Sequence, residues 1–252
     1  MITFKEEVDL KNHTLIIPAV AVGNVGQLTV DLIISSMQLR RIGHFSNSSF
    51  IPVVGTDPYD ENSKEICTSA DLYHSSDKKV VVLQIRSPVI RKLSQFYNEL
   101  KNFIKYHQIS KVVILTSSYS HEIRDVQLKT VRLRYIASTT LTAEDTTQFE
   151  NLNWIKLEPK VVDYVDTEGV LQIPGGGFAK CFFETLEKDE IPCVVLLKFC
   201  SEGDNIPDAL DLLNYLNQWL SIVSHNDDKL LAIKYPSSWK FLFGNSPPSE
   251  IY

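Results

Sequence analysis

LIIPAVAVGNVGQLTVDLIISSM, residues 15–37, is the stretch that decides the fold of this chain. Its first part, residues 15–22, is apolar without polar alternation, which predicts a strand covered on both faces within a parallel sheet. Gly23, Asn24 and Gly26 then predict a tight structural turn, because these residues accept positive φ angles or close backbone packing. The remainder is apolar on most sides of a helix, so that helix has to be buried on most of its surface.

The turn between this strand and this helix leaves two interpretations open. A glycine loop that leads from a strand into a helix can hold a phosphate on the free N–H groups of the helix. Gly23-x-x-Gly26, however, lacks the first half of a dinucleotide-binding fingerprint and has no lysine followed by Ser or Thr, as a P-loop requires. We therefore favour a structural turn and keep a phosphate site as the alternative.

The composition is that of a globular protein, and the net charge argues against some classes of binding partner. It has 252 residues, 44% of them hydrophobic and 22% charged. The formal net charge of −6 argues against binding to nucleic acid or to an anionic membrane, because both require a basic surface. No apolar run approaches the ~20 residues that span a bilayer. Acidic residues stand where a signal peptide would be basic and apolar, so we expect an intracellular, soluble protein.

The four cysteines and the histidines form no pattern that points to a metal or redox centre. There is no C-x-x-C pair, and no histidine stands at metal-ligand spacing from a cysteine. We expect reduced thiols and neither a metal nor a cofactor. The cysteines are Cys67, Cys181, Cys193 and Cys200.

The rest of the chain alternates strands with helices, which is typical of an α/β domain. Residues 80–85, 87–107 and 112–116 predict a strand, a helix and a strand, which together form a βαβ unit with a right-handed crossover. Residues 141–168 predict peripheral loops and a short helix. Further strands are expected at 42–45, 50–54, 70–74 and 194–199, and further helices at 178–186 and 206–223.

Two segments carry side chains suited to chemistry, and each has a plainer interpretation. Residues 117–121, Ser-Ser-Tyr-Ser-His, follow the strand at 112–116, where α/β folds place ligands, but no G-x-S-x-G elbow surrounds the serines. We therefore assign these serines to turns and caps. Arg124, Lys129, Arg132 and Arg134 make a basic segment, which predicts a solvated face or, alternatively, a contact with an acidic partner.

Two more glycine-containing turns precede helices. Gly175, Gly176 and Gly177 resemble a phosphate loop, but their spacing fits no P-loop, so they predict a close backbone approach. The second turn contains Gly203, and one of the two residues that follow it, Asp204 or Asn205, is expected to cap the next helix.

The end of the chain differs in kind from the rest. Residues 235–244 carry a dense aromatic cluster, which we expect to bury large areas against the body. Two prolines then prevent a helix, so we predict one domain over residues 1–244 and a flexible tail over residues 245–252. Ile251 and Tyr252 form an apolar tip that suits recognition by a partner protein.

Seven segments carry a resemblance that runs nearly from end to end, namely PAVAVGNVGQLTVDLIISS, PVVGTDPY, VVVLQIRS, VVILTSS, IPGGG, VLLKFCSEGDNIPDALDLLNYLNQWL and PSSWKFLFG. In these segments and their order the chain resembles the proteasome assembly chaperone family. The resemblance implies a single three-layer α/β domain with a mainly parallel central sheet, related to the purine nucleoside phosphorylase fold but without catalysis.

The resemblance also implies partners. It implies a heterodimer with proteasome assembly chaperone 1 that binds proteasome α subunits, notably α5 and α7, promotes α-ring formation and prevents off-pathway α-ring dimerisation. For such a protein we expect the cytoplasm and the nucleus. Because the related fold and the Gly23–Gly26 turn would also permit a nucleoside phosphorylase or hydrolase, that enzyme class is the alternative function.

Two features of the chain bear on how it meets these partners. The family's C-terminal motif is hydrophobic-Tyr-X, and its matching positions here are Ile251 and Tyr252, without the final X. We therefore predict that the tail contributes only weakly to binding of the α-ring. The helix over residues 25–39 is apolar on most faces, so we predict that part of it, or of its neighbours, lies under the heterodimer interface.

Overall fold

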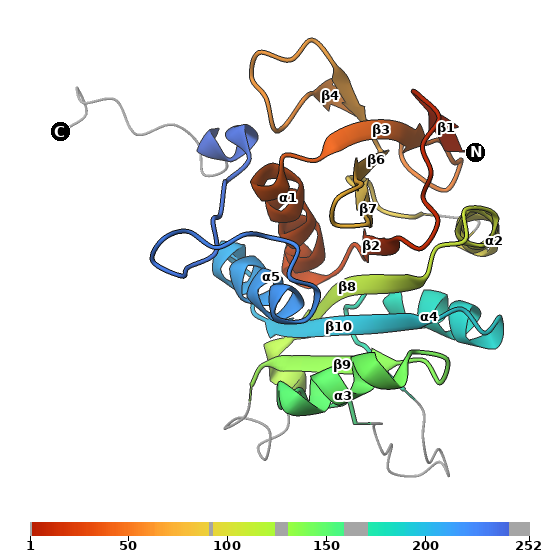
Figure 1. Ribbon diagram of the computed structural model, residues 1–252, viewed down its shortest axis with the longest axis vertical. Coiled ribbons are helices and arrows are strands. Elements are labelled where there is room, and N and C mark those ends of the chain that lie inside the picture. The colour runs from red at the N-terminus through yellow and green to blue at the C-terminus, as the bar shows by residue number, and fades with distance from the viewer. Residues whose placement is uncertain (1, 91–92, 124–130, 159–170, 242–252) are drawn as a thin grey trace.

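An eight-stranded mixed sheet forms the centre of the molecule (Figure 1). The computed structural model describes residues 2–90, 93–123, 131–158 and 171–241. The strands lie in the order β1-β3-β6-β7-β2-β8-β10-β9. Their bounds are β1 (Ile2–Phe4), β2 (Thr14–Pro18), β3 (Arg40–Phe45), β6 (Ala70–Ser75), β7 (Val80–Ile85), β8 (Lys111–Tyr119), β9 (Leu133–Ala137) and β10 (Cys193–Cys200).

The four central strands of the sheet, β7, β2, β8 and β10, run parallel to one another, and the outer strands pair antiparallel. The central strands are rich in apolar residues because both of their faces are covered. In β2, Leu15 and Ile17 face one side of the sheet and Ile16 faces the other. The predicted α/β class with a parallel centre is confirmed.

Helices cover both faces of the sheet and complete three layers (Figure 1). On one face lie α1 (Val25–Met37), α3 (Ala143–Asn151) and α5 (Ile206–Leu220). On the other lie α2 (Leu93–Tyr106) and α4 (Ala179–Lys188), so each face of the sheet has its own hydrophobic core. No helix among the described residues is both long enough and apolar enough to cross a membrane.

The helix α1 begins where the sequence predicts and ends at Met37, two residues before the predicted end. It packs between the sheet and α5, which cover most of its apolar surface. Leu28 and Met37 are only partly buried. Whether part of α1, or a neighbour of it, meets a partner stays a prediction.

Several predicted elements differ in extent from those observed. The strand predicted at 112–116 continues to Tyr119, and the helix predicted from Ser87 is described only from Leu93. Val89 forms a single bridge with Phe50, and of the strand predicted at 50–54 only Val54 lies in a strand, β4. The sequence pattern missed four short strands, namely β1, β9 and the two strands β4 (Val54–Thr56) and β5 (Ile66–Thr68), which form a separate sheet.

The prediction that the basic segment is exposed to solvent is wrong for Arg134. This residue lies in β9, which pairs with β10, and it is only 1% exposed. Its guanidinium donates to the carbonyl oxygens of Val131 and Leu133 and lies 5.9 Å from the ring centroid of Phe199. Pairing with β10 turns alternate residues of β9 toward the core, which carries the arginine inward. Arg132 is exposed, whereas Arg124 and Lys129 lie outside the described residues.

Candidate functional site

The carboxyl ends of the parallel strands are the usual ligand site of such a sheet, and here the chain's own loop fills the place. The Thr116 hydroxyl donates to the carbonyl oxygen of Gly176 at 2.9 Å, and the Ser118 hydroxyl donates to that of Pro174 at 2.7 Å. The Ser117 hydroxyl donates to the carbonyl oxygen of Val22. Ser117 and Ser118 lie in β8 rather than in the predicted loop, and their hydroxyls are used in hydrogen bonds to backbone carbonyl oxygens of other segments.

The predicted structural turn before α1 is confirmed. Gly23 and Asn24 both adopt positive φ angles, of 62° and 52°. A Cβ atom on Gly26 would stand 2.5 Å from the carbonyl oxygen of Leu115, so the helix can begin this close to β8 only with glycine. The Asn205 side chain lies against Gly23, where a Cβ atom would stand 2.5 Å from its Oδ1. Gly23 and Gly26 thus allow the start of α1 to pack closely on Asn205, just before α5, and on β8.

We expect Gly26→Ala to destabilise the protein by about 1–3 kcal/mol, the usual cost of forcing an extra methyl into a packed site. Denaturant unfolding measures this loss. Gly55→Ala is the matched control, since a Cβ there meets only the Cys67 sulfur at an ordinary 3.5 Å. Equal stability of the two variants would contradict the packing role of Gly26.

Of the other two predicted turns, the one at residues 175–177 serves packing, whereas Gly203 only supplies a positive φ angle. Gly175 and Gly177 have positive φ angles, and a Cβ on Gly177 would stand 2.2 Å from the Val20 carbonyl oxygen, which confirms the predicted close approach. Gly176 is buried between them. Before α5, Gly203 has a φ of 137°, and the Asp204 carboxylate accepts from the Ile206 N–H at 3.0 Å, as a cap does. Asn205 donates instead to the Ser201 carbonyl oxygen and to the Asp208 carboxylate.

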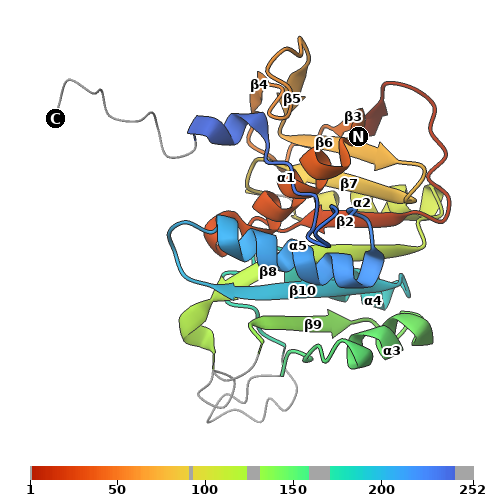
Figure 2. The ribbon, with the colours of Figure 1, turned by 60° about the vertical axis from the view of Figure 1, so that its left-hand side comes forward.

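A different part of the surface is notable for exposed apolar side chains. We define the arm as residues 50–69, which contain β4, β5 and the loop between them and project beyond the main sheet (Figure 2). Among the described residues, ten large apolar side chains are exposed. Four of them belong to the arm, and two more, Ile90 and Leu93, come shortly after β7. We call these six the arm patch: Ile51, Val53, Val54, Ile66, Ile90 and Leu93.

Backbone geometry explains why the arm turns apolar side chains outward. In the β4–β5 pair, Val54 lies opposite Thr68 and Ile66 lies opposite Thr56, so all four side chains share one face. The alternate face carries Cys67, which is buried, and the Val54 side chain on the outer face is 69% exposed.

Residues 89 and 90 contact the chain at the start of the arm. Phe50 bridges to Val89, and the Ile90 N–H donates to the carbonyl oxygen of Ser49 at 2.9 Å. These contacts place Val89 and Ile90 beside the first residues of the arm.

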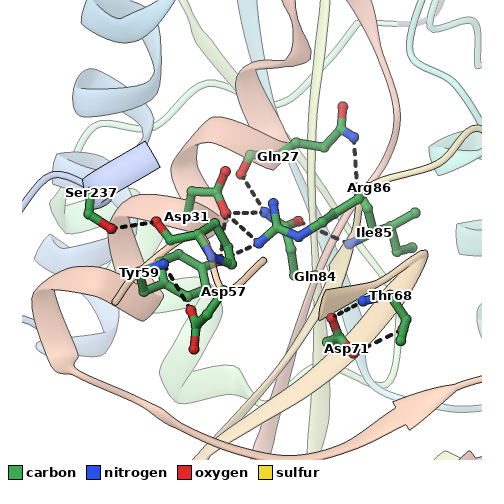
Figure 3. Close-up of polar contacts among 11 residues, drawn as sticks. Gln27, Asp31, Asp57, Tyr59, Thr68, Asp71, Gln84, Ile85, Arg86 and Ser237 are labelled. Atoms are coloured by element: carbon green, nitrogen blue, oxygen red, sulfur yellow. Dashed lines mark hydrogen bonds and ion pairs between the residues drawn. The ribbon is translucent and has the colours of Figure 1, made fainter. Parts of the chain in front are cut away.

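A buried polar network ties the arm to the body (Figure 3). Tyr59, in the arm loop, donates its hydroxyl to Asp31 Oδ1 on α1 at 2.5 Å. The same oxygen accepts from Gln84 of β7 at 2.7 Å and from Arg86 at 3.2 Å. Arg86 also donates to the Tyr59 hydroxyl at 2.8 Å. The loop thus shares one carboxylate with the first helix and a central strand.

The electrostatics of this network keep its members in fixed protonation states. Burial, and next the Asp31 carboxylate, raise the pKa of Tyr59 well above its ordinary value. Burial opposes the charged form of Arg86, yet Tyr59 and Asp31 outweigh burial and raise the pKa of its guanidinium. Near neutral pH, Tyr59 therefore stays a hydrogen-bond donor and Arg86 stays a cation.

The last described segment, η4 (Ser237–Phe241), also packs on the arm loop. The Ser237 hydroxyl and the Ser238 N–H both donate to the carbonyl oxygen of Pro58, at 3.1 and 3.0 Å. Lys240 pairs with Glu61 at 2.6 Å (Figure 2 shows the segment beside the arm). The expected burial of the aromatic cluster is wrong at Tyr235, which is 51% exposed. The predicted partner-binding residues Ile251 and Tyr252 lie outside the described residues, as does the whole predicted tail.

The sequence interpretation missed the residues of this network, although two signals point to them. Asp31 is a charged residue within an otherwise apolar helix, and Arg86 directly follows an apolar strand. A buried charge needs a partner, but no local pattern identifies which one. The four cysteines are free thiols, and the described residues contain no group of three His, Cys, Asp or Glu side chains that could hold a metal ion.

Solved structures with this fold come from several organisms. Pyrococcus furiosus PbaA, an archaeal homolog of proteasome-assembly chaperone, superposes with a TM-score of 0.64 at 16% identity, over 90% of this chain and 89% of that chain. Pyrococcus furiosus PbaB, an archaeal proteasome activator, superposes with a TM-score of 0.60 at 16% identity, over 88% of each chain. At these identities the likeness shows a common fold.

Sequence comparison goes further. A cattle protein named proteasome assembly chaperone 2 is 41% identical over 97% of this chain and 96% of its own length. The human protein of that name is 39% identical over the same shares, and the baker's yeast protein of that name is 24% identical over 91% of this chain and 94% of its own. The model of the PAC2 family matches residues 15–231. On these matches, the chain belongs to the PAC2 family.

Proposed function

We propose that this chain is a proteasome assembly chaperone that acts by binding other proteins. The observation that carries this proposal is its identity of 39–41% to proteins named proteasome assembly chaperone 2, over 97% of its own length. The fold alone would not suffice, because one fold hosts many activities.

The geometry favours binding over catalysis. The carboxyl edge of the sheet is packed with the chain's own loop, whose carbonyl oxygens accept from Thr116, Ser117 and Ser118. An enzyme of the nucleoside phosphorylase or hydrolase class would need that edge open to its substrate. The arm, in contrast, exposes aliphatic side chains on a firmly held hairpin, and such surfaces suit protein partners.

The finer role follows from the resemblance of the whole chain. We propose a heterodimer with proteasome assembly chaperone 1 that binds proteasome α subunits, notably α5 and α7. This heterodimer promotes formation of the α-ring and keeps α-rings from dimerising off the pathway, in the cytoplasm and the nucleus. The tip Ile251-Tyr252 adds a weak contact with the α-ring, and the folded surface and the partner chain supply most of the binding.

Co-expression with tagged proteasome assembly chaperone 1 and the α subunits tests this role. Capture of the tagged partner should recover the chain together with α5 and α7. Removal of residues 250–252 should leave pairing unchanged and lower recovery of the α subunits only a few-fold. Recovery of neither partner, or phosphorolysis of a nucleoside by the purified chain, would contradict the proposal; complete loss of the α subunits on truncation would contradict the weak role of the tail.

A further inference from the structure

A groove between α2 and α4 contains the one exposed thiol of the chain. The groove encloses about 410 Å³, and Tyr97 of α2 and Cys181 of α4 both line it. Cys181 is exposed, whereas Cys67, Cys193 and Cys200 are buried. A reagent in solution has to reach the sulfur before it can react, so exposure singles out Cys181.

Burial also keeps two of the other thiols in their unreactive form. It raises the pKa of Cys193 to about 12 and the pKa of Cys200 to about 11. Both thiols therefore stay protonated near neutral pH, and the thiolate is the form that attacks a disulfide. Chemistry at sulfur is thus directed to the groove between α2 and α4.

Tyr97 is a second, independent indication that this groove takes a ligand. Its side chain is only 7% exposed, and its hydroxyl has no hydrogen-bond partner among the described residues. An unpaired buried hydroxyl costs stability, and an acceptor on a ligand would remove that cost. Burial, and next the Cys181 thiol, raise the pKa of Tyr97 to about 12, so the hydroxyl stays a donor near this sulfur.

The charged side chains of the groove leave an excess of positive charge. Those that line it are Lys101, Glu184, Lys188 and Asp189. Lys101 and Lys105 share the Asp189 carboxylate, at 3.1 and 2.7 Å. Glu184 pairs with a lysine of its own helix at 3.6 Å. Lys188 forms no ion pair with any described residue, so lysines outnumber carboxylates here and the groove suits an anion.

We propose that Cys181 forms a reversible mixed disulfide with a small disulfide that carries carboxylates, with glutathione disulfide as the probe. The Cys181 thiolate attacks one sulfur of the probe and forms a new S–S bond, while the original S–S bond breaks. The other half leaves as a thiolate and takes up a proton, which replaces the one that Cys181 lost. The sulfur of Cys181 is thereby oxidised and the sulfur of the leaving half is reduced.

The bound half lies between the two helices, where its carboxylates meet the lysines and one of its acceptors meets the Tyr97 hydroxyl. Excess thiol reverses the exchange. This inference goes beyond the proposed function, because it adds a redox-dependent modification to a protein that acts by binding.

Incubation of the full chain with glutathione disulfide tests the site. The intact mass should rise by that of one glutathionyl group, and peptide mapping should place the group on Cys181. Cys181→Ser should stay unmodified, and excess reduced glutathione should remove the group from the natural chain. An unmodified natural chain, or modification that falls mainly on the buried cysteines, would overturn the proposal.

The neutral reagent hydroxyethyl disulfide separates the effect of the groove from that of exposure alone. Lys188→Glu should slow the reaction with glutathione disulfide about 3-fold to 10-fold, since it repels the carboxylates of that reagent, and should leave the reaction with hydroxyethyl disulfide unchanged. Lys64→Glu, which makes the same change of charge at an exposed position on the arm, is the control and should react as the natural chain does. Equal slowing with both reagents, or in both variants, would contradict the role of the lysines.

Tyr97→Phe tests the hydroxyl. It should lower the equilibrium constant for the glutathione mixed disulfide about 5-fold, the usual effect of one hydrogen bond. Its thermal midpoint, measured without glutathione, should not fall below that of the natural chain, because the lost hydroxyl has no partner. An unchanged equilibrium constant would show that the hydroxyl does not bind the ligand.

Discussion

Asp31→Ala is expected to lower the free energy of unfolding by about 3–5 kcal/mol, the usual cost of removing one member of a buried ion pair. The Arg86 and Asp31 side chains are only 18% and 12% exposed, so water cannot take over from the lost carboxylate. Gln84 would lose the shorter of the two hydrogen bonds that it donates and keep the one to the Gln27 carbonyl oxygen. The loss corresponds to a fall of about 10 °C in the thermal midpoint of a protein of this size.

Denaturant unfolding, with hydrogen exchange across residues 57–65, measures the effect of Asp31→Ala. Exchange in the arm loop should accelerate more than exchange in β8, since Tyr59 loses its acceptor on α1. Asp227→Ala is the control, because Asp227 is exposed and its loss should stay within about 0.5 kcal/mol. An arm loop that exchanges as slowly as in the natural chain would show that the network does not hold the arm.

Phe96→Ala should cost about 3–5 kcal/mol, as for other large rings removed from a core. Phe96 is 0% exposed and lies 5.8 Å from Phe45, 5.4 Å from Phe50 and 5.3 Å from Phe178, measured between ring centroids. Its removal leaves a cavity between α2, α4 and the root of the arm, which these rings cannot close without leaving their own contacts.

Chemical denaturation measures the cost at Phe96, and Leu93→Ala on the same helix serves as the control. Leu93 is exposed, so its truncation should change the free energy of unfolding by under about 1 kcal/mol. Partner binding should weaken in Phe96→Ala only as far as the folded fraction falls. A cost at Phe96 as small as at Leu93 would contradict its central place in this core.

The elements that sequence patterns predicted correctly are those whose signal is local. Strands β2, β7 and β10 are continuous apolar runs, and α1 and α5 carry apolar residues at helical spacing. The turn before α1 was predictable because Gly23 and Asn24 are residue types that accept positive φ. The missed strands β1, β4, β5 and β9 have at most five residues each, so their formation depends on the strand beside them.

Local sequence patterns were enough to predict the fold class, the central parallel strands and the structural turns, because strands buried on both faces must be rich in apolar residues. The burial of Arg134 and the packing of α5 on α1 depend instead on how the elements are arranged in space. The same arrangement brings Asp31, Tyr59 and Arg86 together, although they stand 27 or more positions apart in the chain. Such contacts depend on how distant segments pack, and spacing along the chain does not encode them.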